Sequence, residues 1–164
     1  SGIHSNGYGL ARKVLQEIGS YNLADRPDLL EGRSVGEALI EPTRIYSKNV
    51  MDAVSVYTVK RPVKAMVHIT GGGLAGNISR LVPPGFTVKI NGDSWPVPPI
   101  FELISHTGPV DPMEMRKVFN MGIGFVLIVS PHFASPVMSR LSRSGERCFL
   151  IGKIKKGSVP VAWN

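Results

Sequence analysis

The feature that most constrains this chain is a glycine-rich segment that runs directly into a helical pattern. Residues 1–9 read SGIHSNGYG, and apolar residues then recur at helical spacing at Leu10, Val14, Leu15 and Ile18. The start of a helix exposes backbone N–H groups and the positive end of the helix dipole, so such a loop favours a bound anion. Ser5 or Asn6 can cap the helix, and Gly7 lets a ligand approach the backbone closely. An ordinary capped helix after a tight turn explains this segment equally well.

A second segment repeats the arrangement. Apolar residues alternate along 63–69, which is typical of a strand, and the glycines at 71–73 then precede a short helical stretch over 74–81. Neither segment matches the dinucleotide motif G-x-G-x-x-G or the P-loop. Two glycine-rich loops that open helices, each beside a histidine, a hydroxyl and an arginine, nevertheless favour an anion-binding site over two plain turns.

These segments resemble the two glycine-rich motifs of the phosphoribosylformylglycinamidine cyclo-ligase family, also called aminoimidazole ribonucleotide synthetases. The motifs are SGIHSNGY at residues 1–8 and HITGGGL at residues 68–74. Further matches follow in order along the chain: EPTRIY at 41–46, NISR at 77–80, FNMGIG at 119–124 and LIGK at 150–153. The resemblance covers only the second half of that enzyme, and we expect the first domain, with its aspartate-rich metal and nucleotide segments, to be absent. The start at Ser1, inside a motif, suggests a fragment of a larger enzyme.

Helical and strand patterns interleave along the chain. Its 164 residues suffice for one core and are too few for two ordinary domains. We therefore expect a single α/β domain over 1–164, with helices packed on a mixed sheet. The resemblance implies, more specifically, a three-layer α/β/α sandwich with some likeness to the ferredoxin arrangement.

Capping signals and hydrophobic periods predict the remaining elements. Helices are expected from the Ser34–Glu37 capping box to Pro42, over 50–59, from Pro99 onward, from Pro112 to Gly122, and from Ser135 to Gly145. Strands are expected over 43–46, 86–90, 125–129 and 148–154.

The chain is basic, with 19 Lys and Arg against 12 Asp and Glu and a formal net charge of +7. The basic residues are mostly dispersed, so we do not expect nucleic acid as a partner, and phosphorylated substrates and a more acidic partner domain account better for the charge. No apolar run approaches the roughly 20 residues that span a bilayer, and no signal peptide is evident. We therefore expect no membrane contact and a cytoplasmic location. The one cysteine, Cys148, is expected to be a buried thiol.

The resemblance implies an ATP-dependent ligase of purine biosynthesis. Its substrate would be formylglycinamidine ribonucleotide, and its products would be aminoimidazole ribonucleotide, ADP and phosphate. ATP would phosphorylate the formyl oxygen, and attack by the amidine nitrogen would then close the ring as phosphate leaves. Such a route needs donors around the phosphoryl oxygens, a metal ion and a cleft shielded from water. The chain offers no cluster of Asp or Glu for Mg²⁺, so the metal ligands and much of the ATP pocket are expected in the first domain. The complete enzyme is expected to be a homodimer, and this chain alone to be inactive.

The residues of this chain that could bind phosphate or substrate lie in and beside the two glycine-rich motifs: Gly2, His4, Ser5, Asn6, Gly7, Thr70, Gly71, Gly72, Gly73, Asn77 and Arg80. His68 is the expected catalytic residue, because at the end of the alternating strand it could bond a phosphoryl oxygen or move a proton. A structural histidine bonded to a loop carbonyl is the alternative. The four histidines lack zinc-site spacing, so no metal site is expected here.

Two other functions stay open. One is a different enzyme of the same superfamily, such as formylglycinamide ribonucleotide amidotransferase, selenophosphate synthetase or thiamine monophosphate kinase, although the segments at 41–44 and 119–120 look more like the cyclo-ligase. The other is a phosphate-binding or regulatory module that catalyses no reaction.

Overall fold

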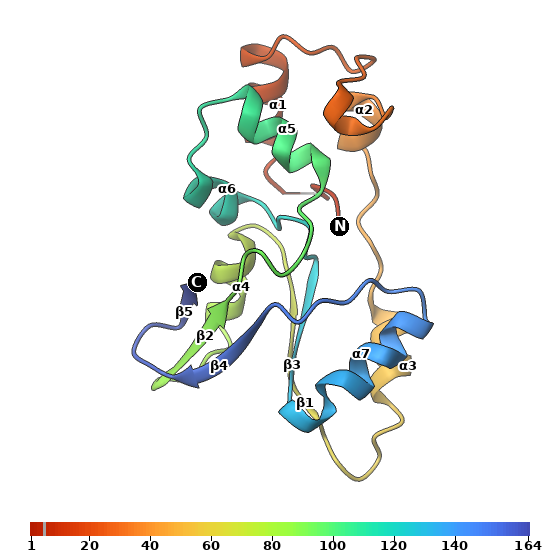
Figure 1. Ribbon diagram of the computed structural model, residues 1–164, viewed down its shortest axis with the longest axis vertical. Helices are drawn as coiled ribbons and strands as arrows, with labels where there is room; N and C mark the ends of the chain where they lie inside the picture. Colours follow the sequence, from red (N-terminus) through yellow and green to blue (C-terminus); the bar gives the residue numbers. More distant parts are fainter. Residues whose placement is uncertain (5) are drawn as a thin grey trace. The chain divides into compact units, whose positions relative to one another are not determined.

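The computed structural model describes residues 1–4 and 6–164, which divide into two compact units. The first unit contains residues 1–44, 69–80 and 96–124, and the second contains residues 45–68, 81–95 and 125–164. The described residues form seven α-helices and two small sheets, so the expected mixed α/β composition is confirmed (Figure 1). Every described strand belongs to the second unit, and the first unit is helical.

The first unit is built from short helices. Its α-helices are α1 (Tyr8–Arg12), α2 (Val35–Leu39), α4 (Gly73–Ser79), α5 (Pro99–Thr107) and α6 (Pro112–Val118). A π-helical stretch, Lys13–Ile18, continues α1, so the helix expected from the apolar spacing of residues 10–18 is present.

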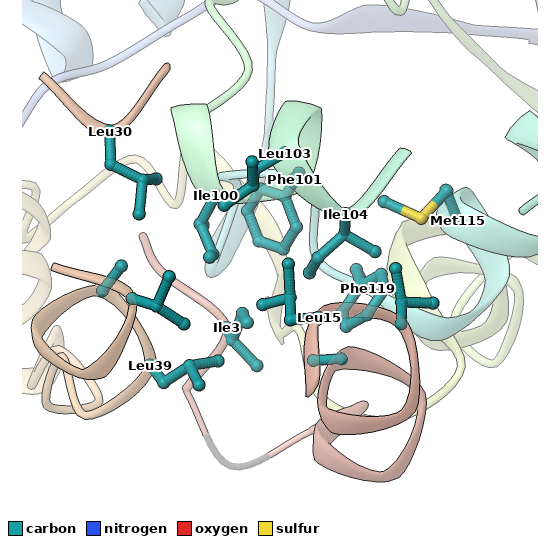
Figure 2. Packing of buried hydrophobic residues seen from close by; sticks show 14 residues of the cluster. Ile3, Leu15, Leu30, Leu39, Ile100, Phe101, Leu103, Ile104, Met115 and Phe119 are labelled. Carbon is teal, nitrogen blue, oxygen red and sulfur yellow. The ribbon is translucent and has the colours of Figure 1, made fainter. Parts of the chain in front are cut away.

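A large apolar cluster stabilises the first unit. Figure 2 shows α5 turning Ile100, Phe101 and Ile104 toward side chains of the N-terminal segment, the π-helical stretch and the end of α6. Phe101 is fully buried, and its ring centroid lies 5.5 Å from that of Phe119. Burial of aromatic and aliphatic side chains in this way is the main stabilising term for a unit of this size.

The helix starts predicted at Ser34, Pro99 and Pro112 are confirmed, and two of them have side-chain caps. The Glu37 N–H donates to Ser34 Oγ at 3.1 Å, and the Ser34 N–H donates to Glu37 Oε2 at 2.6 Å, which completes the capping box of α2. The Asp111 carboxylate caps α6 by accepting from the N–H of Met113 at 2.7 Å.

The second unit contains both sheets. β1 (Val63–His68) pairs antiparallel with β3 (Phe125–Val129). In the other sheet β2 (Phe86–Ile90) lies between β4 (Gly152–Lys156), which is antiparallel to it, and β5 (Val161–Trp163), which is parallel. This three-stranded sheet is mixed, as expected, but the strands form two sheets and not one.

Two helices pack together in the second unit. α3 (Ser47–Val54) and α7 (Ala134–Arg143) share a small apolar cluster, consisting of Val50, Ala53, Val137 and Leu141. Cys148 packs against this cluster half-buried, and burial raises the pKa of its thiol, with a further contribution from the charge of Glu146. The thiol therefore stays protonated at neutral pH, in keeping with a structural role.

Several expected boundaries are wrong. Residues 43–46 form no strand, and the helix expected over 50–59 is shifted to Ser47–Val54. The strand expected over 148–154 starts only at Gly152, where pairing with β2 begins. The helix from Pro112 ends at Val118, because Phe119 has extended backbone with ψ 158°. β5 was not predicted.

Candidate functional site

Residues 2–4 of the first glycine-rich segment are buried within the first unit. Gly2 and His4 are buried, and His4 has a φ of 58°, a left-handed value that is uncommon for residues with a side chain. Ser5, an expected capping and binding residue, lies outside the described residues. The N-cap of α1 is Gly7, without a side-chain cap bond, so the expectation that Asn6 caps this helix is wrong.

Gly7 packs so closely against Val118 and Phe119 that a side chain would not fit there. Its φ is 79°, and a Cβ added there would lie 2.7 Å from Phe119 Cδ1 and 2.9 Å from Val118 Cγ1. Real Cβ atoms do not approach other atoms so closely. Because Gly7 has no side chain, the Phe119 ring can pack directly against its backbone, whether or not a ligand also approaches there.

Asn77 shapes the second glycine-rich loop from within. Its Nδ2 donates to the carbonyl oxygens of Gly73 at 2.7 Å, Thr70 at 3.1 Å and Gly71 at 3.2 Å, and its Oδ1 accepts from Thr70 Oγ1 at 3.1 Å. The side chain is buried. Because its amide bonds the loop, Asn77 is suited to fixing the path of the loop more than to contacting a ligand directly.

The two glycine-rich segments meet at Asn6 and Gly71. A Cβ added at Gly71 would lie 3.3 Å from Asn6 Oδ1, while Gly71 and Gly72 themselves are exposed. Gly73 is buried against the end of α6, where an added Cβ would lie 3.0 Å from the carbonyl oxygen of Phe119. The point where Asn6 adjoins the exposed Gly71 and Gly72 is the centre of the candidate site.

Arg80 lies away from the centre of the candidate site. It is the C-cap residue of α4, at the opposite end of that helix from the glycines, and it is exposed.

Sequence reasoning missed Asn120 as an individual residue. This buried side chain donates from Nδ2 to the carbonyl of Gly2 at 2.7 Å, and its Oδ1 accepts from the N–H of Gly122 at 2.7 Å. The only available signal was its place in the FNMGIG segment, which does not indicate the partner 118 residues away.

His68 belongs to the second unit, whereas both glycine-rich segments belong to the first. It ends β1 with its side chain exposed between the buried Val67 and Ile69, so the alternation expected from the sequence is confirmed. Its ring centroid lies 6.1 Å from that of Tyr46 and 6.2 Å from that of Phe125, its cross-strand neighbour.

The described residues do not provide a metal site. Over residues 1–4 and 6–164, no three His, Cys, Asp or Glu side chains lie close enough to hold an ion. The carboxylate beside Gly2, that of Glu41, already pairs with Arg33 at 3.0 Å. Over the same residues, no helix has both the length and the apolar character needed to cross a membrane.

Comparison with known proteins gives consistent matches. Residues 1–163 match the family described as AIR synthase related protein, C-terminal domain. The chain is 47% identical over 164 residues to phosphoribosylformylglycinamidine cyclo-ligase of Brevibacillus brevis, which covers 100% of the chain and 46% of that protein. It is 45% identical over 156 residues to the protein of the same name from Syntrophus aciditrophicus, covering 95% of the chain and 44% of that protein. It is 44% identical over 157 residues to that of Bacillus subtilis, covering 96% of the chain and 44% of that protein. The chain thus spans less than half the length of these relatives.

Proposed function

The chain belongs to the family of AIR synthase related proteins, C-terminal domain, and on this premise we propose that it is the second half of a phosphoribosylformylglycinamidine cyclo-ligase. The observation that carries the proposal is the identity of 44–47% to proteins of that name, extending over almost the whole chain. The complete enzyme would use ATP to close the imidazole ring of aminoimidazole ribonucleotide in purine biosynthesis. We expect it to be cytoplasmic and homodimeric.

The single match over residues 1–163 supports treating both units as one domain, equivalent to the second half of the relatives. In the complete enzyme we expect the helices and strands of this domain to complete a three-layer α/β/α sandwich.

We infer that the glycine-rich site binds a phosphate group of the substrate or of ATP. Three features support this: Gly71 and Gly72 are exposed, the Asn6 amide adjoins them, and the Thr70 hydroxyl lies in the same loop. Backbone N–H and amide groups held in place before the substrate arrives stabilise phosphoryl oxygens without reorganisation during the reaction. Gly2, His4, Gly7, Gly73 and Asn77 would shape this site, and Ser5 remains a proposed contact of it. Arg80, at the other end of α4, remains a proposed substrate contact away from this site.

The described residues do not fit Mg²⁺, which prefers several carboxylate or water oxygens in octahedral geometry. We therefore propose that the metal ligands and most of the ATP pocket lie in the half of the enzyme that this chain does not span. His68 is the proposed acid–base residue, since its imidazole is exposed at the end of β1 and an imidazole can both donate and accept a proton.

Complementation of this chain with the first half of the Brevibacillus brevis relative tests the proposal. The assembled pair is supplied with ATP, Mg²⁺ and formylglycinamidine ribonucleotide, and ADP release and ring closure are followed. Turnover with this substrate is expected, and none with selenide, with thiamine monophosphate, or with formylglycinamide ribonucleotide supplied together with ammonia as its nitrogen donor. Turnover with one of the other substrates would assign a different enzyme of the superfamily. Phosphate binding without any turnover would favour a module that catalyses no reaction.

A further inference from the structure

We propose that Asn120 is a positioning residue for the glycine-rich site, holding the first glycine-rich segment in the arrangement that places Asn6 beside Gly71. The inference rests on the proposed function of these segments in binding phosphate. Asn120 itself is buried and need not touch the ligand.

The first argument is the pair of hydrogen bonds that the side chain makes. Nδ2 donates to the Gly2 carbonyl and Oδ1 accepts from the Gly122 N–H, both at 2.7 Å, while the backbone nitrogen of Ser1 donates to the Gly122 carbonyl at 2.9 Å. A carboxamide can make both bonds because one end donates and the other accepts. Asn120 thus ties the N-terminal segment to the turn that follows α6.

The second argument is the backbone on either side of this link. His4 and Met121 both have left-handed backbone, with φ of 58° and 51°, although neither is glycine. Such conformations persist only where the surrounding contacts over-determine them, and they concentrate at ligand clamps and active sites. Of the four such residues in the described chain, His4 and Met121 lie in the two segments that Asn120 joins, and Ser20 and Glu31 lie elsewhere.

The third argument is that the turn contacts both glycine-rich segments. The Phe119 ring leaves no room for a side chain at Gly7, and the Phe119 carbonyl oxygen would lie 3.0 Å from a Cβ at Gly73. A change at Asn120 is therefore transmitted to the segment that carries Asn6. The expected consequence is a displaced Asn6 amide and a weaker phosphate site.

The test compares three variants of the chain. Asn120→Asp keeps the shape and the acceptor of the side chain but loses the donor to Gly2 and buries a carboxylate. Asn120→Ser keeps a hydroxyl that can accept from the Gly122 N–H, but it is too short to reach Gly2. Asn91→Asp is the matched control: Asn91 is an exposed turn residue of the second unit whose Oδ1 accepts from the Asp93 N–H at 3.1 Å, and a carboxylate keeps that bond.

The readouts are the dissociation constant for inorganic phosphate, amide chemical shifts of residues 2–9 and 70–74, and the melting temperature. Both Asn120 variants should bind phosphate between roughly tenfold and a hundredfold more weakly, the range found when outer partners of metal ligands are removed. The shifts of residues 2–9 should move in these variants, and Asn91→Asp should bind like the parent chain.

The outcomes separate the two proposals. A parent chain that does not bind phosphate overturns the proposed site and, with it, the role of Asn120. A parent chain that binds, together with an Asn120→Ser variant that melts earlier but binds equally well, overturns the positioning role alone and leaves Asn120 as a stabilising residue. If Asn120→Asp does not fold, Asn120→Ser decides the matter, because it buries no charge.

Discussion

Gly7 and Gly9 stand two residues apart and have opposite surroundings. Gly7 has a φ of 79° and faces the Phe119 ring, whereas Gly9 lies within α1, where an added Cβ would meet nothing within 4 Å beyond its own stretch of helix. Gly7→Ala should therefore destabilise the chain by about 1–3 kcal/mol through overpacking, with a further penalty from left-handed backbone. Gly9→Ala should stabilise it by roughly 0.5–1 kcal/mol, since alanine loses less entropy in a helix.

Urea unfolding of both variants measures this difference. The same measurement is needed to interpret a larger replacement at Gly7. If Gly7→Val loses phosphate binding, the cause could be a disturbed fold as readily as a side chain that blocks the phosphate. Equal stabilities of the two alanine variants would contradict the packing described for Gly7.

Glu37 should make the stability of the chain depend on pH. Its pKa is lowered by hydrogen bonds from the Ser34 backbone and side chain, and by the nearby charge of Arg26. Because the pKa is lowered in the folded chain, the stabilisation is present above the pKa of the unfolded state and is lost as the pH falls through the folded value. Glu37→Gln keeps a capping partner without the charge. The melting temperature of the parent chain should exceed that of this variant at neutral pH, and the gap should close once the pH is below the folded pKa. A gap that does not change with pH would contradict the ionic contribution.

His68 can be tested in the complementing pair. If it moves a proton during ring closure, His68→Ala should lower kcat by roughly 10²–10⁴-fold, the usual scale for acid–base groups, with a much smaller change in KM. The melting temperature should change little, because the side chain is exposed. His132→Ala, at another exposed histidine of the second unit, is the control. A lowered melting temperature with near-normal kcat would assign His68 a structural role instead.

At the scale of elements, the sequence predicted best what is decided locally. The Ser34 capping box and the Asp111–Pro112 helix start depend on residues within one turn, and the structure contains both. Residues 43–46 and 148–151 have strand-like composition but find no strand partner among the described residues, and β5 forms only because β2 lies beside it. Strand pairing is a tertiary property, so composition alone misplaced these elements.

In the candidate site too, the sequence predicted some features and missed others. The two glycine-rich segments were identified from their residues, since a run of glycines before a helical pattern marks a loop whose backbone is open to close approach. The roles of Asn77 and Asn120 were not predicted, because each depends on which carbonyl groups its amide reaches in the folded chain. An asparagine that shapes a loop and one that binds a ligand look identical in a sequence.

In the three-stranded sheet of the second unit, two lysines face each other across neighbouring strands, and this repulsion can be removed by substitution. Lys153 on β4 lies directly opposite Lys89 on β2, whereas Lys156 lies opposite Phe86. Like charges facing each other across a sheet destabilise it, and an opposite pair contributes roughly 0.2–1 kcal/mol. Lys153→Glu should therefore raise stability toward urea more than Lys156→Glu, which changes the net charge equally. Equal effects would show that only the overall charge matters.

At the scale of the whole molecule, the most informative feature was the order of several short motifs along the chain. No single motif identified the family, but their succession from residue 1 to residue 153 did, and the match over residues 1–163 confirms it. Composition and length alone would have indicated only a basic protein long enough for one core.

The last prediction concerns the whole molecule: we expect this chain by itself to be folded but unable to close the imidazole ring. The described residues include a buried core in each unit, which supports a stable fold. They include no group of three carboxylates, thiols or imidazoles that could hold Mg²⁺ beside the phosphates of ATP, and phosphoryl transfer relies on such an ion to spread developing charge.

The chain alone should therefore show a cooperative melting transition and no ADP release above background with ATP, Mg²⁺ and formylglycinamidine ribonucleotide. Adding the first half of the Brevibacillus brevis relative should restore turnover, and His68→Ala should abolish most of what is restored. Ring closure by the chain alone would mean that the phosphoryl-transfer site lies within these 164 residues, and the assignment of the metal ligands to the other half would then be wrong.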